Sequence, residues 1–556
     1  MNERDAKTSP PQPPSPAGRG GSNTGTGTPL PRLRLPLSLR ERGLGGEVFA
    51  CLLLLASLAS ADDKPARPRI DPAGVKGELL LAASGVPDLA LQRFVERAGG
   101  DKAKILVLVA GKEKLSPRLR KLAGEAKVEV RSVTATDDGS VPDFADLGGV
   151  WIVGDDVPRL RKALVGTALV KGCRDVLARG GIVAASGPSA VLLTRTPIEG
   201  KAKGCDLFPD AIVELGAEAS KLSTALKANP GHVGYSIAPG GVLLARGRRL
   251  AAIGSGKVSA VLVATSTREE RRIPLGGDQV EDSTTLRRAA RDRADAFPSA
   301  KVGKPVVAKG TLIIIGGGGM PRGMIAKFVE LAGGKEAKIV VLSTAMPDPV
   351  PPDSIAGAFT KAGAKKVTTL PGRTLAEVES KESLAALKEA TGIWFGGGRQ
   401  WRFVDAYENT KAIPLMFDVL ARGGVIGGSS AGATIQGEYL ARGGVFDNFA
   451  PMYEGYERGL SFLPGVAIDQ HFAQRKRFAD MTSLVKTFPH YLGIGLDEAT
   501  AIVVRGNIAS VEGRGKAHFY DSKKEPVKGK PDHDSLGDGA KYNLKTRKVL
   551  AAPEKE

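Results

Sequence analysis

The chain has 556 residues, of which 42% are hydrophobic and 25% charged, and its formal net charge is +19. This composition is typical of a globular protein that is long enough to bury two cores of ordinary domain size. Lys and Arg are spread along the chain and aromatic residues make up only 5% of it. We therefore expect no nucleic-acid partner, which a basic helix or a basic patch with interleaved aromatic side chains would indicate.

The first 61 residues are expected to be a leader. Residues 1 to 45 are rich in Pro, Gly, Ser and Arg and show no apolar periodicity, so they predict disorder. Basic Arg40 and Arg42, the apolar run 48–58 and the small residues before Ala61 follow the order of a secretory signal peptide cleaved after Ala61. The apolar run is too short for a comfortable membrane span. The sequence thus predicts periplasmic or extracellular export without an integral membrane span, with an uncleaved anchor as the alternative.

Two parts of the chain repeat each other at a spacing of about 240 residues. The sequence FVERAGG at 94–100 returns as FVELAGG at 328–334, and DVLARGG occurs at both 175–181 and 418–424. A period of this length indicates duplicated domains. We expect the leader at 1–61, the first copy at 62–268, a charged, helix-bearing linker with a solvated face at 269–305, the second copy at 306–521, and a basic, loosely ordered tail at 522–556.

In the second copy, short apolar segments alternate with amphipathic ones. Strands are expected at 311–315, 338–342, 366–370, 392–395 and 425–428, and helices at 321–331, 353–362, 374–390 and 415–421. The alternation predicts an α/β fold with a mostly parallel sheet that helices cover on both faces. Further strands at 508–511 and 516–520 are expected to extend an edge.

The segment GGSSAGA at 427–433 follows one of these strands. Small neighbours let the chain turn sharply, so the Ser430 hydroxyl can be exposed at a helix N-terminus, where N–H groups face developing negative charge. A serine nucleophile needs a base and a carboxylate that orients the base. His471 and Glu498 each follow an apolar run and are the candidates, with Asp497 as an alternative carboxylate.

Four motifs then occur in order: IWFGGGRQ at 393–400, GGSSAGA at 427–433, DQHF at 469–472 and GIGLDEATA at 493–501. Together they resemble the cyanophycinase family of serine peptidases, which is related to aspartyl dipeptidases. With the repeat, the resemblance implies two tandem, doubly wound, mostly parallel-sheet α/β domains of class I glutamine amidotransferase-like type. Ser430 replaces the cysteine with which glutamine amidotransferases react, which argues against that chemistry.

The resemblance also implies roles for individual residues. Ser430 would be the nucleophile, His471 the general base and Glu498 its orienting carboxylate. The N–H groups of Ala431 and Gly397 would form the oxyanion hole. The residues implied to line the substrate pocket are Gln400, Asp469, Gln470, Arg475 and Arg477. No metal and no other cofactor is implied.

Two positions depart from the family pattern. Arg399 stands where Asp or Asn is common, and Asp480 stands where a further arginine is often found. An acid at that place would repel an aspartyl substrate. Cyanophycin, a polyaspartate backbone that carries arginine side chains, is therefore a less secure substrate than an acidic peptide bond in general.

The first copy is predicted to be non-catalytic. In the register of the repeat, Gly187 lies opposite Ser430, Gly216 opposite His471 and Pro239 opposite Glu498. No member of the triad is kept. Its two cysteines, Cys173 and Cys205, could form a disulfide, which the sequence leaves open.

The sequence thus predicts an exported serine-type peptidase that hydrolyses peptide or isopeptide bonds at aspartyl residues through an acyl-enzyme, with a peptide or an aspartyl-containing polymer as its partner. An aspartyl dipeptidase-like exopeptidase and a non-catalytic peptide-binding protein are the alternatives. The oligomeric state, including a homodimer, stays open.

Overall fold

The computed structural model describes residues 68–111, 115–133, 142–198, 202–216, 221–277, 280–347, 354–524 and 529–551. The leader and the signal peptide that we expect to end near Ala61 lie outside the described residues, so export stays a prediction. None of the helices in the described ranges combines the length and the apolar character that crossing a membrane requires.

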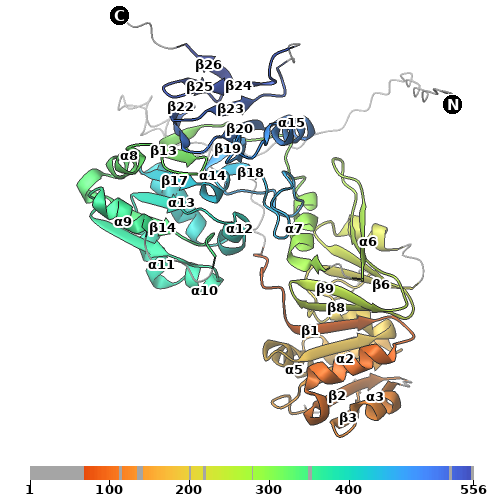
Figure 1. Ribbon diagram of the computed structural model, residues 1–556. Coiled ribbons are helices and arrows are strands. Elements are labelled where there is room, and N and C mark those ends of the chain that lie inside the picture. Colours follow the sequence, from red (N-terminus) through yellow and green to blue (C-terminus); the bar gives the residue numbers. More distant parts are fainter. Residues whose placement is uncertain are drawn as a thin grey trace, which may run out of the picture. The chain divides into compact units, whose positions relative to one another are not determined.

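The N-terminal half contains an eight-stranded and a four-stranded sheet (Figure 1). The larger sheet has the order β12 (Glu281–Asp282), β9 (Arg249–Gly254), β8 (Gly241–Gly247), β1 (Val75–Ala82), β5 (Ile182–Ser186), β4 (Gly149–Gly154), β2 (Lys104–Ala110), β3 (Lys127–Ser132). The smaller sheet has the order β11 (Arg271–Leu275), β10 (Val258–Leu262), β7 (Val233–Ile237), β6 (Ala211–Leu215). The helices are α2 (Asp88–Ala98), α3 (Leu115–Ala123), α4 (Val157–Leu164), α5 (Ala168–Ala178), α6 (Leu222–Ala228) and α7 (Ser283–Ala294).

The C-terminal half contains a nine-stranded and a five-stranded sheet. The larger sheet has the order β15 (Lys366–Leu370), β14 (Lys338–Leu342), β16 (Gly392–Phe395), β17 (Val425–Ser429), β13 (Val307–Ile315), β21 (Thr500–Gly506), β22 (Ile508–Gly513), β25 (Lys541–Asn543), β26 (Lys548–Leu550). The smaller sheet has the order β18 (Gly437–Leu440), β19 (Leu463–Asp469), β20 (Leu492–Leu496), β23 (Ala517–Tyr520), β24 (His533–Leu536). The helices are α8 (Met324–Leu331), α9 (Ser354–Lys361), α10 (Leu375–Val378), α11 (Lys381–Glu389), α12 (Trp401–Tyr407), α13 (Ala412–Ala421), α14 (Ala431–Thr434) and α15 (Phe478–Thr487).

The two large sheets follow the same path. One reads β3-β2-β4-β5-β1-β8-β9 and the other β15-β14-β16-β17-β13-β21-β22. In both, the first five strands pair in parallel and the next two are antiparallel. This shared path agrees with the repeat in the sequence, while duplication as its origin stays a prediction.

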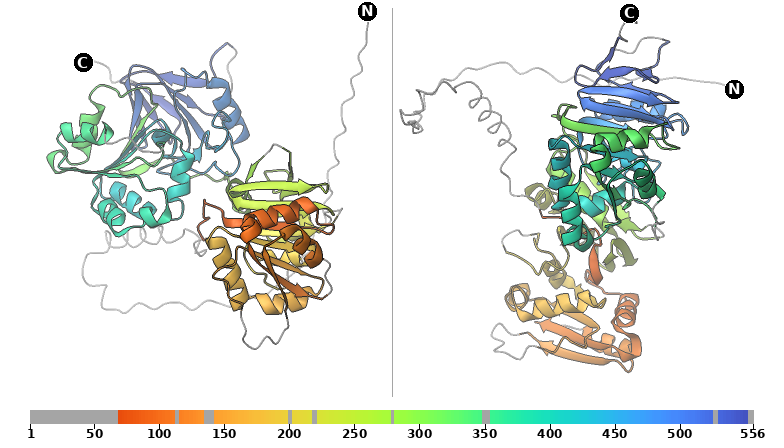
Figure 2. Two further views of the ribbon diagram at one scale, coloured as in Figure 1. Left: turned by 60° about the horizontal axis from the view of Figure 1, so that its bottom comes forward. Right: turned by 90° about the vertical axis from the view of Figure 1, so that its left-hand side faces the viewer.

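Strand β13 shows why helices cover both faces of the C-terminal sheet. Its successive side chains point to opposite faces. Leu312 and Ile314 pack into one apolar core, whereas Ile313 and Ile315 pack into another core together with Phe328 of α8. All four strand residues are fully buried, so helices must shield both faces, and Figure 2 shows them on both sides of the sheet.

The single helix expected at 374–390 is wrong. The structure has two helices there, α10 and α11. Ser380 separates them because its hydroxyl oxygen accepts a hydrogen bond from the Ser383 N–H at 3.2 Å, which caps the start of α11. The hydroxyl of Thr374 caps α10 in the same way.

The segment 269–305 bears the helix that we expected, but the expectation that its charges form a solvated face is wrong. Residues of this segment form β11, within the four-stranded sheet, and α7, in which ten of twelve residues are buried. Arg288 is only 3% exposed and lies 3.0 Å from Glu408 and 3.3 Å from Asp405. Arg293 likewise pairs with Glu454, whereas Arg287 pairs with Asp210 of the N-terminal half. Carboxylates of both halves thus compensate the buried arginines of α7.

The tail expected to be loosely ordered at 522–556 instead carries three strands. Strand β24 pairs with β23, and β25 and β26 extend the nine-stranded sheet. The strands expected at 508–511 and 516–520 are therefore not edge strands, because a further strand pairs beside each of them. Tyr542 and Leu544 are fully buried in this region. The many charged residues around them had suggested disorder.

Cys173 and Cys205 are both buried, and neither forms a disulfide. Burial raises the pKa of each thiol to about 12. Both thiols are therefore protonated at neutral pH and have the low reactivity of buried cysteines.

Candidate active site

Ser430 lies in the turn between β17 and α14 (Figure 1). Its φ is 57° and its ψ is −116°, a conformation that costs a residue other than glycine about 1–3 kcal/mol. Its neighbours must be small because the turn leaves no room for larger side chains. A Cβ atom at Gly428 would lie 2.3 Å from the carbonyl oxygen of Gly432, and one at Gly432 would lie 2.0 Å from that of Phe395. The turn thus has the geometry of a nucleophile elbow.

Three side chains form a chain of hydrogen bonds at this turn. The Ser430 Oγ lies 2.9 Å from His471 Nε2, and His471 Nδ1 lies 2.6 Å from Glu498 Oε1. When Nδ1–H donates to the carboxylate, Nε2 is left to accept the hydroxyl proton of Ser430. The structure therefore brings together the three residues that the sequence analysis selected.

These residues follow the carboxyl ends of strands in two different sheets. Ser430 follows β17 of the nine-stranded sheet, whereas His471 and Glu498 follow β19 and β20 of the five-stranded sheet. The backbone N–H of His471 donates to the Gly316 carbonyl at 2.7 Å, and that of Ala499 donates to the Gly317 carbonyl at 2.8 Å. The loop after β13 thus fixes the two sheets to each other at the site.

The glycine loop at 316–319 was not among the site residues predicted from the sequence. A Cβ atom at Gly317 would lie 2.5 Å from a carbon of the His471 ring, and one at Gly318 would lie 2.1 Å from the Glu498 carboxyl carbon. Any larger residue would push the base or its carboxylate away. The run of four glycines at 316–319, directly after an apolar strand, was the signal that could have revealed it.

Asp497, the alternative carboxylate, does not contact His471. Its Oδ1 lies 3.2 Å from His518 Nε2 and accepts the Ala473 N–H at 3.0 Å, while Oδ2 accepts the Lys516 N–H at 3.0 Å. The neighbouring acids therefore point to different histidines. Only Glu498 is placed to orient His471.

Burial lowers the pKa of His471 from its usual 6.5, and the positive charges of Arg475 and Arg477 lower it further. The hydrogen bond that Nδ1–H donates to Glu498 is the second-largest influence after burial and, with the charge of that carboxylate, raises the pKa of His471 without reversing the downward shift. The imidazole is therefore neutral at neutral pH, the form in which Nε2 can accept a proton.

Two N–H groups expected to face an oxyanion lie beside Ser430. Ala431 is the first residue of α14, and the first amides of a helix have no acceptor within it. A Cβ atom at Gly397 would lie 3.7 Å from Ser430 Cβ, so this glycine also borders the nucleophile.

Two of the residues expected in the substrate pocket are instead held inside the protein. Asp469 is 2% exposed and Arg477 is 3% exposed. Arg477 Nη1 donates to Asp469 at 2.6 Å and to the Gln470 carbonyl at 2.7 Å, and Arg442 Nε donates to Asp469 at 2.9 Å. These charges neutralise one another and support the loop that carries His471.

The two glutamines differ. Gln400 is buried and its Nε2 donates to the carbonyls of Ala441 and Arg442 at 3.0 and 2.7 Å, so it supports a neighbouring loop. Gln470 is also buried, but its Oε1 has no hydrogen-bond partner. A buried acceptor without a donor is costly, so this oxygen is available to a donor on a ligand.

Arg475 and Arg399 are the exposed guanidinium groups near the site. The Arg475 N–H donates to the His471 carbonyl at 3.0 Å, and its charge acts on the pKa of His471. Arg399 follows the glycine loop that contains Gly397. Neither side chain has an ion-pair partner among the residues that the structure describes.

Asp480 does not present a free negative charge to a substrate, which corrects the expected repulsion. Its Oδ2 accepts a hydrogen bond from Arg442 Nη2 at 2.5 Å. Arg442 thus bridges Asp480 and Asp469, a role that no motif in the sequence indicated.

The family model of peptidase family S51 matches residues 312–511. A cyanophycinase from Synechococcus elongatus is 32% identical over 266 residues, which cover 43% of this chain and 81% of the relative. A cyanophycinase from Geminocystis herdmanii is 28% identical over 245 residues, covering 41% of this chain and 90% of the relative.

Two solved structures are also similar. A peptidase from an acI-B1 Actinobacterium is 22% identical with a TM-score of 0.33, and the match covers 42% of this chain and 97% of that one. A putative peptidase E protein from Listeria monocytogenes is 20% identical with a TM-score of 0.28, covering 37% and 100%. The sequence matches to the cyanophycinases carry the assignment: the chain belongs to the cyanophycinase family of serine peptidases, peptidase family S51, and is a serine-type peptidase.

Proposed function

We propose that the chain hydrolyses peptide or isopeptide bonds at aspartyl residues through an acyl-enzyme on Ser430. The observation that carries the proposal is the hydrogen-bonded chain from Ser430 through His471 to Glu498, with separations of 2.9 and 2.6 Å. The names of the relatives point to cyanophycin, a polyaspartate backbone with arginine side chains, as one substrate to test.

In this mechanism, Ser430 Oγ attacks the carbonyl carbon while His471 Nε2 takes the hydroxyl proton. The C–N bond then breaks, and His471 returns the proton to the leaving amine. Water attacks the acyl-enzyme with His471 again as the base, which releases the acid and restores Ser430. Glu498 holds the imidazole in the required tautomer and stabilises its charged form.

The N–H groups of Ala431 and Gly397 would stabilise the oxyanion that forms at the carbonyl. One such donor typically contributes about 3 kcal/mol to lowering the barrier. Ser430 would lie between these two N–H groups and His471.

Substrate choice would depend on Arg475, with Arg399 as a second cation. Guanidinium groups bind carboxylates through paired hydrogen bonds. Both side chains are exposed, Arg475 four residues after His471 and Arg399 two residues after Gly397. Gln470 Oε1, which lacks a donor, would accept a hydrogen bond from the substrate. Asp469 and Arg477 would act as positioning residues.

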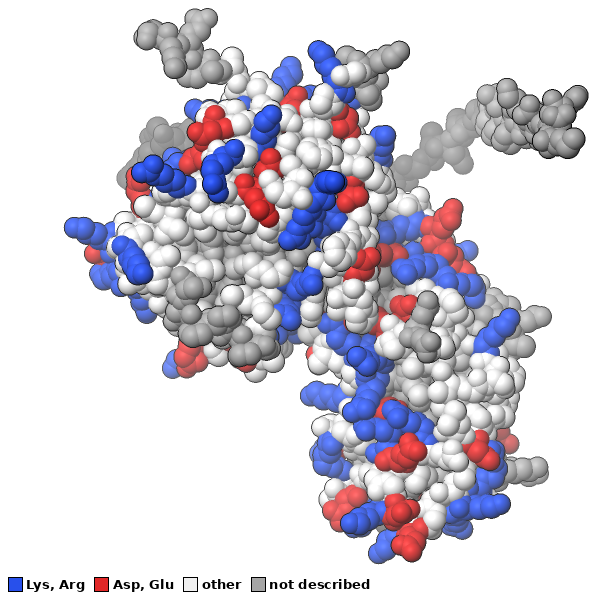
Figure 3. Space-filling model, viewed as in Figure 1, with Lys and Arg blue, Asp and Glu red and all other residues white. Residues whose placement is uncertain are grey.

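Chemistry would be confined to the C-terminal half. Gly187 and Gly216 follow β5 and β6 at the places where Ser430 and His471 follow β17 and β19, and glycine supplies neither a nucleophile nor a base. Lys and Arg are scattered among Asp and Glu on the face shown in Figure 3, which agrees with a peptide partner better than with nucleic acid.

Replacing Ser430 by Ala in the full chain should lower kcat by about a millionfold on every substrate, because among the described residues no other nucleophile contacts His471. Hydrolysis of a β-aspartyl-arginine polymer, of aspartyl dipeptides and of neutral peptides measures it. Ser429→Ala is the matched control, since the adjacent serine has no role in the hydrogen-bonded chain. Activity that survives in Ser430→Ala would place the nucleophile elsewhere, including in the N-terminal half. Preference for dipeptides over the polymer would indicate an exopeptidase.

Glu498→Gln should lower kcat by about 10⁴-fold, because the amide can hold the wrong histidine tautomer. The neighbouring Asp497→Asn is the matched control and should keep most of the activity, since Asp497 faces His518. Steady-state kinetics of both variants decide between the two acids. An equal loss in both, at unchanged folded content, would contradict the assignment of Glu498.

The acidic limb of the kcat/KM profile should have its midpoint below pH 6.5, because burial lowers the pKa of His471 and the base works only when neutral. Activity is lost as pH falls through this lowered pKa. Arg475→Met should move the midpoint upward, since removing a nearby positive charge favours the imidazolium form. Lys476→Met is the control. A midpoint above pH 7 in the wild type would contradict the account.

A further inference from the structure

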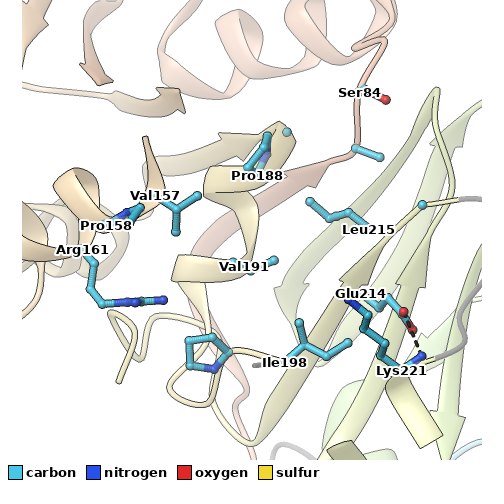
Figure 4. A pocket seen from close by; sticks show the side chains of 14 residues that line it. Ser84, Val157, Pro158, Arg161, Pro188, Val191, Ile198, Glu214, Leu215 and Lys221 are labelled. Carbon is cyan, nitrogen blue, oxygen red and sulfur yellow. Dashed lines mark hydrogen bonds between the residues drawn. The ribbon is translucent and has the colours of Figure 1, made fainter. Parts of the chain in front are cut away.

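A cavity of about 710 Å³ lies in the N-terminal half, outside the active site (Figure 4). Its volume falls within the range of about 300–1,000 Å³ that is typical of ligand sites. The cavity opens at the carboxyl ends of β1, β5 and β6. In open α/β sheets, ligands bind at this end of the strands.

The cavity occupies the place that the active site has in the other half. Ala83 and Ser84 follow β1 as Gly316 and Gly317 follow β13. Gly187 follows β5 where Ser430 follows β17, and a Cβ atom there would meet nothing within 4 Å. Loss of the reactive side chains thus leaves open space at the strand ends.

Most of the wall is apolar. Helix α4 contributes Val157 and Pro158, the turn after β5 contributes Pro188 and Val191, and Ile198 and Leu215 border the other side. Such a surface binds the apolar body of a ligand, while a few polar groups set its orientation.

The free charge that faces the cavity is positive. Both oxygens of Glu214 are engaged, because they accept the N–H groups of Lys221 and Leu222 at 3.1 and 2.9 Å. Arg161 extends from α4 into the cavity (Figure 4), and its Nε is buried without a hydrogen-bond partner. Among the described residues, no carboxylate pairs with it.

Strand β6 borders the cavity but does not offer its edge to a ligand. It is the edge strand of the four-stranded sheet, yet Ala211, Ile212 and Val213 are at most 1% exposed and Glu214 is 8% exposed. The apolar wall and the charge of Arg161 therefore decide which ligand fits the cavity.

We propose that this cavity is a non-catalytic site for small ligands that carry a carboxylate and an apolar body, such as an acylated dipeptide. Arg161 would bind the carboxylate, and the apolar body would lie against Val191 and Ile198. The site goes beyond the peptidase activity and does not rest on it.

The test uses the full chain with Ser430→Ala, so that bound peptides are not cleaved. Calorimetric titration with acetyl-Ala-Leu as the free acid and as its amide measures the contribution of the carboxylate. The acid should bind with one site per chain and at least tenfold more tightly than the amide. Adding Arg161→Met should abolish that difference, whereas Lys162→Met, on the same helix but outside the cavity wall, should preserve it. Thermal melts show that each variant is folded.

A second variant keeps Arg161 and removes space. Val191→Phe should prevent binding of acid and amide alike. The proposal is overturned by equal affinity for acid and amide, by undiminished binding to Arg161→Met, or by inorganic phosphate displacing the peptide at matched concentration. Weakening by Arg475→Met instead of Arg161→Met would place the peptide at the active site and also overturn it. None of these results depends on hydrolysis, so failure of the proposed peptidase specificity is measured separately.

Discussion

The site depends on a constraint of the backbone. The ends of strands from two sheets must lie so close together that the side chains following them reach the hydroxyl oxygen of Ser430. Ser430 has a conformation that L-residues avoid, and the glycine loop at 316–319 holds the strands of the second sheet against it through hydrogen bonds to His471 and Ala499. The packing of the surrounding sheet offsets the free-energy cost of the strained backbone at Ser430. Without the space that Gly317 and Gly318 leave, the imidazole and its carboxylate could not reach the hydroxyl.

Buried ion pairs link arginines of the N-terminal half to carboxylates of the C-terminal half. Asp405 accepts hydrogen bonds from Arg248 at 2.5 Å and from the Tyr456 hydroxyl at 2.6 Å, and Arg288 lies close to it. These residues come from both halves of the chain and are largely buried. Removing one partner of such a network would leave a buried charge uncompensated. Because each of these pairs takes up one negative charge for one positive charge, it leaves the net charge of +19 unchanged.

Much of the C-terminal half was predictable because its signals are local. Apolar runs gave the bounds of β14, β15 and β16 as the structure has them, and the small residues around Ser430 reveal the turn that they permit. The roles of Asp469 and Asp480 were not predictable, because each pairs with Arg442, which is distant in sequence and belongs to no motif. The burial of α7 was missed for the same reason: its arginines look solvated until their carboxylate partners are known. Local sequence patterns predict secondary-structure elements, whereas ion pairs between residues that are distant in sequence can be recognised only when the fold is known.

Covalent labelling tests the central claim, that Ser430 is the activated nucleophile, most directly. The full chain would be treated with a fluorophosphonate, which reacts with activated serine hydroxyls, and the adduct would be located by peptide mass spectrometry. The account predicts one adduct, on Ser430, that disappears in His471→Ala because the hydroxyl then lacks its base. An adduct on another residue, or no adduct on folded protein, would contradict it.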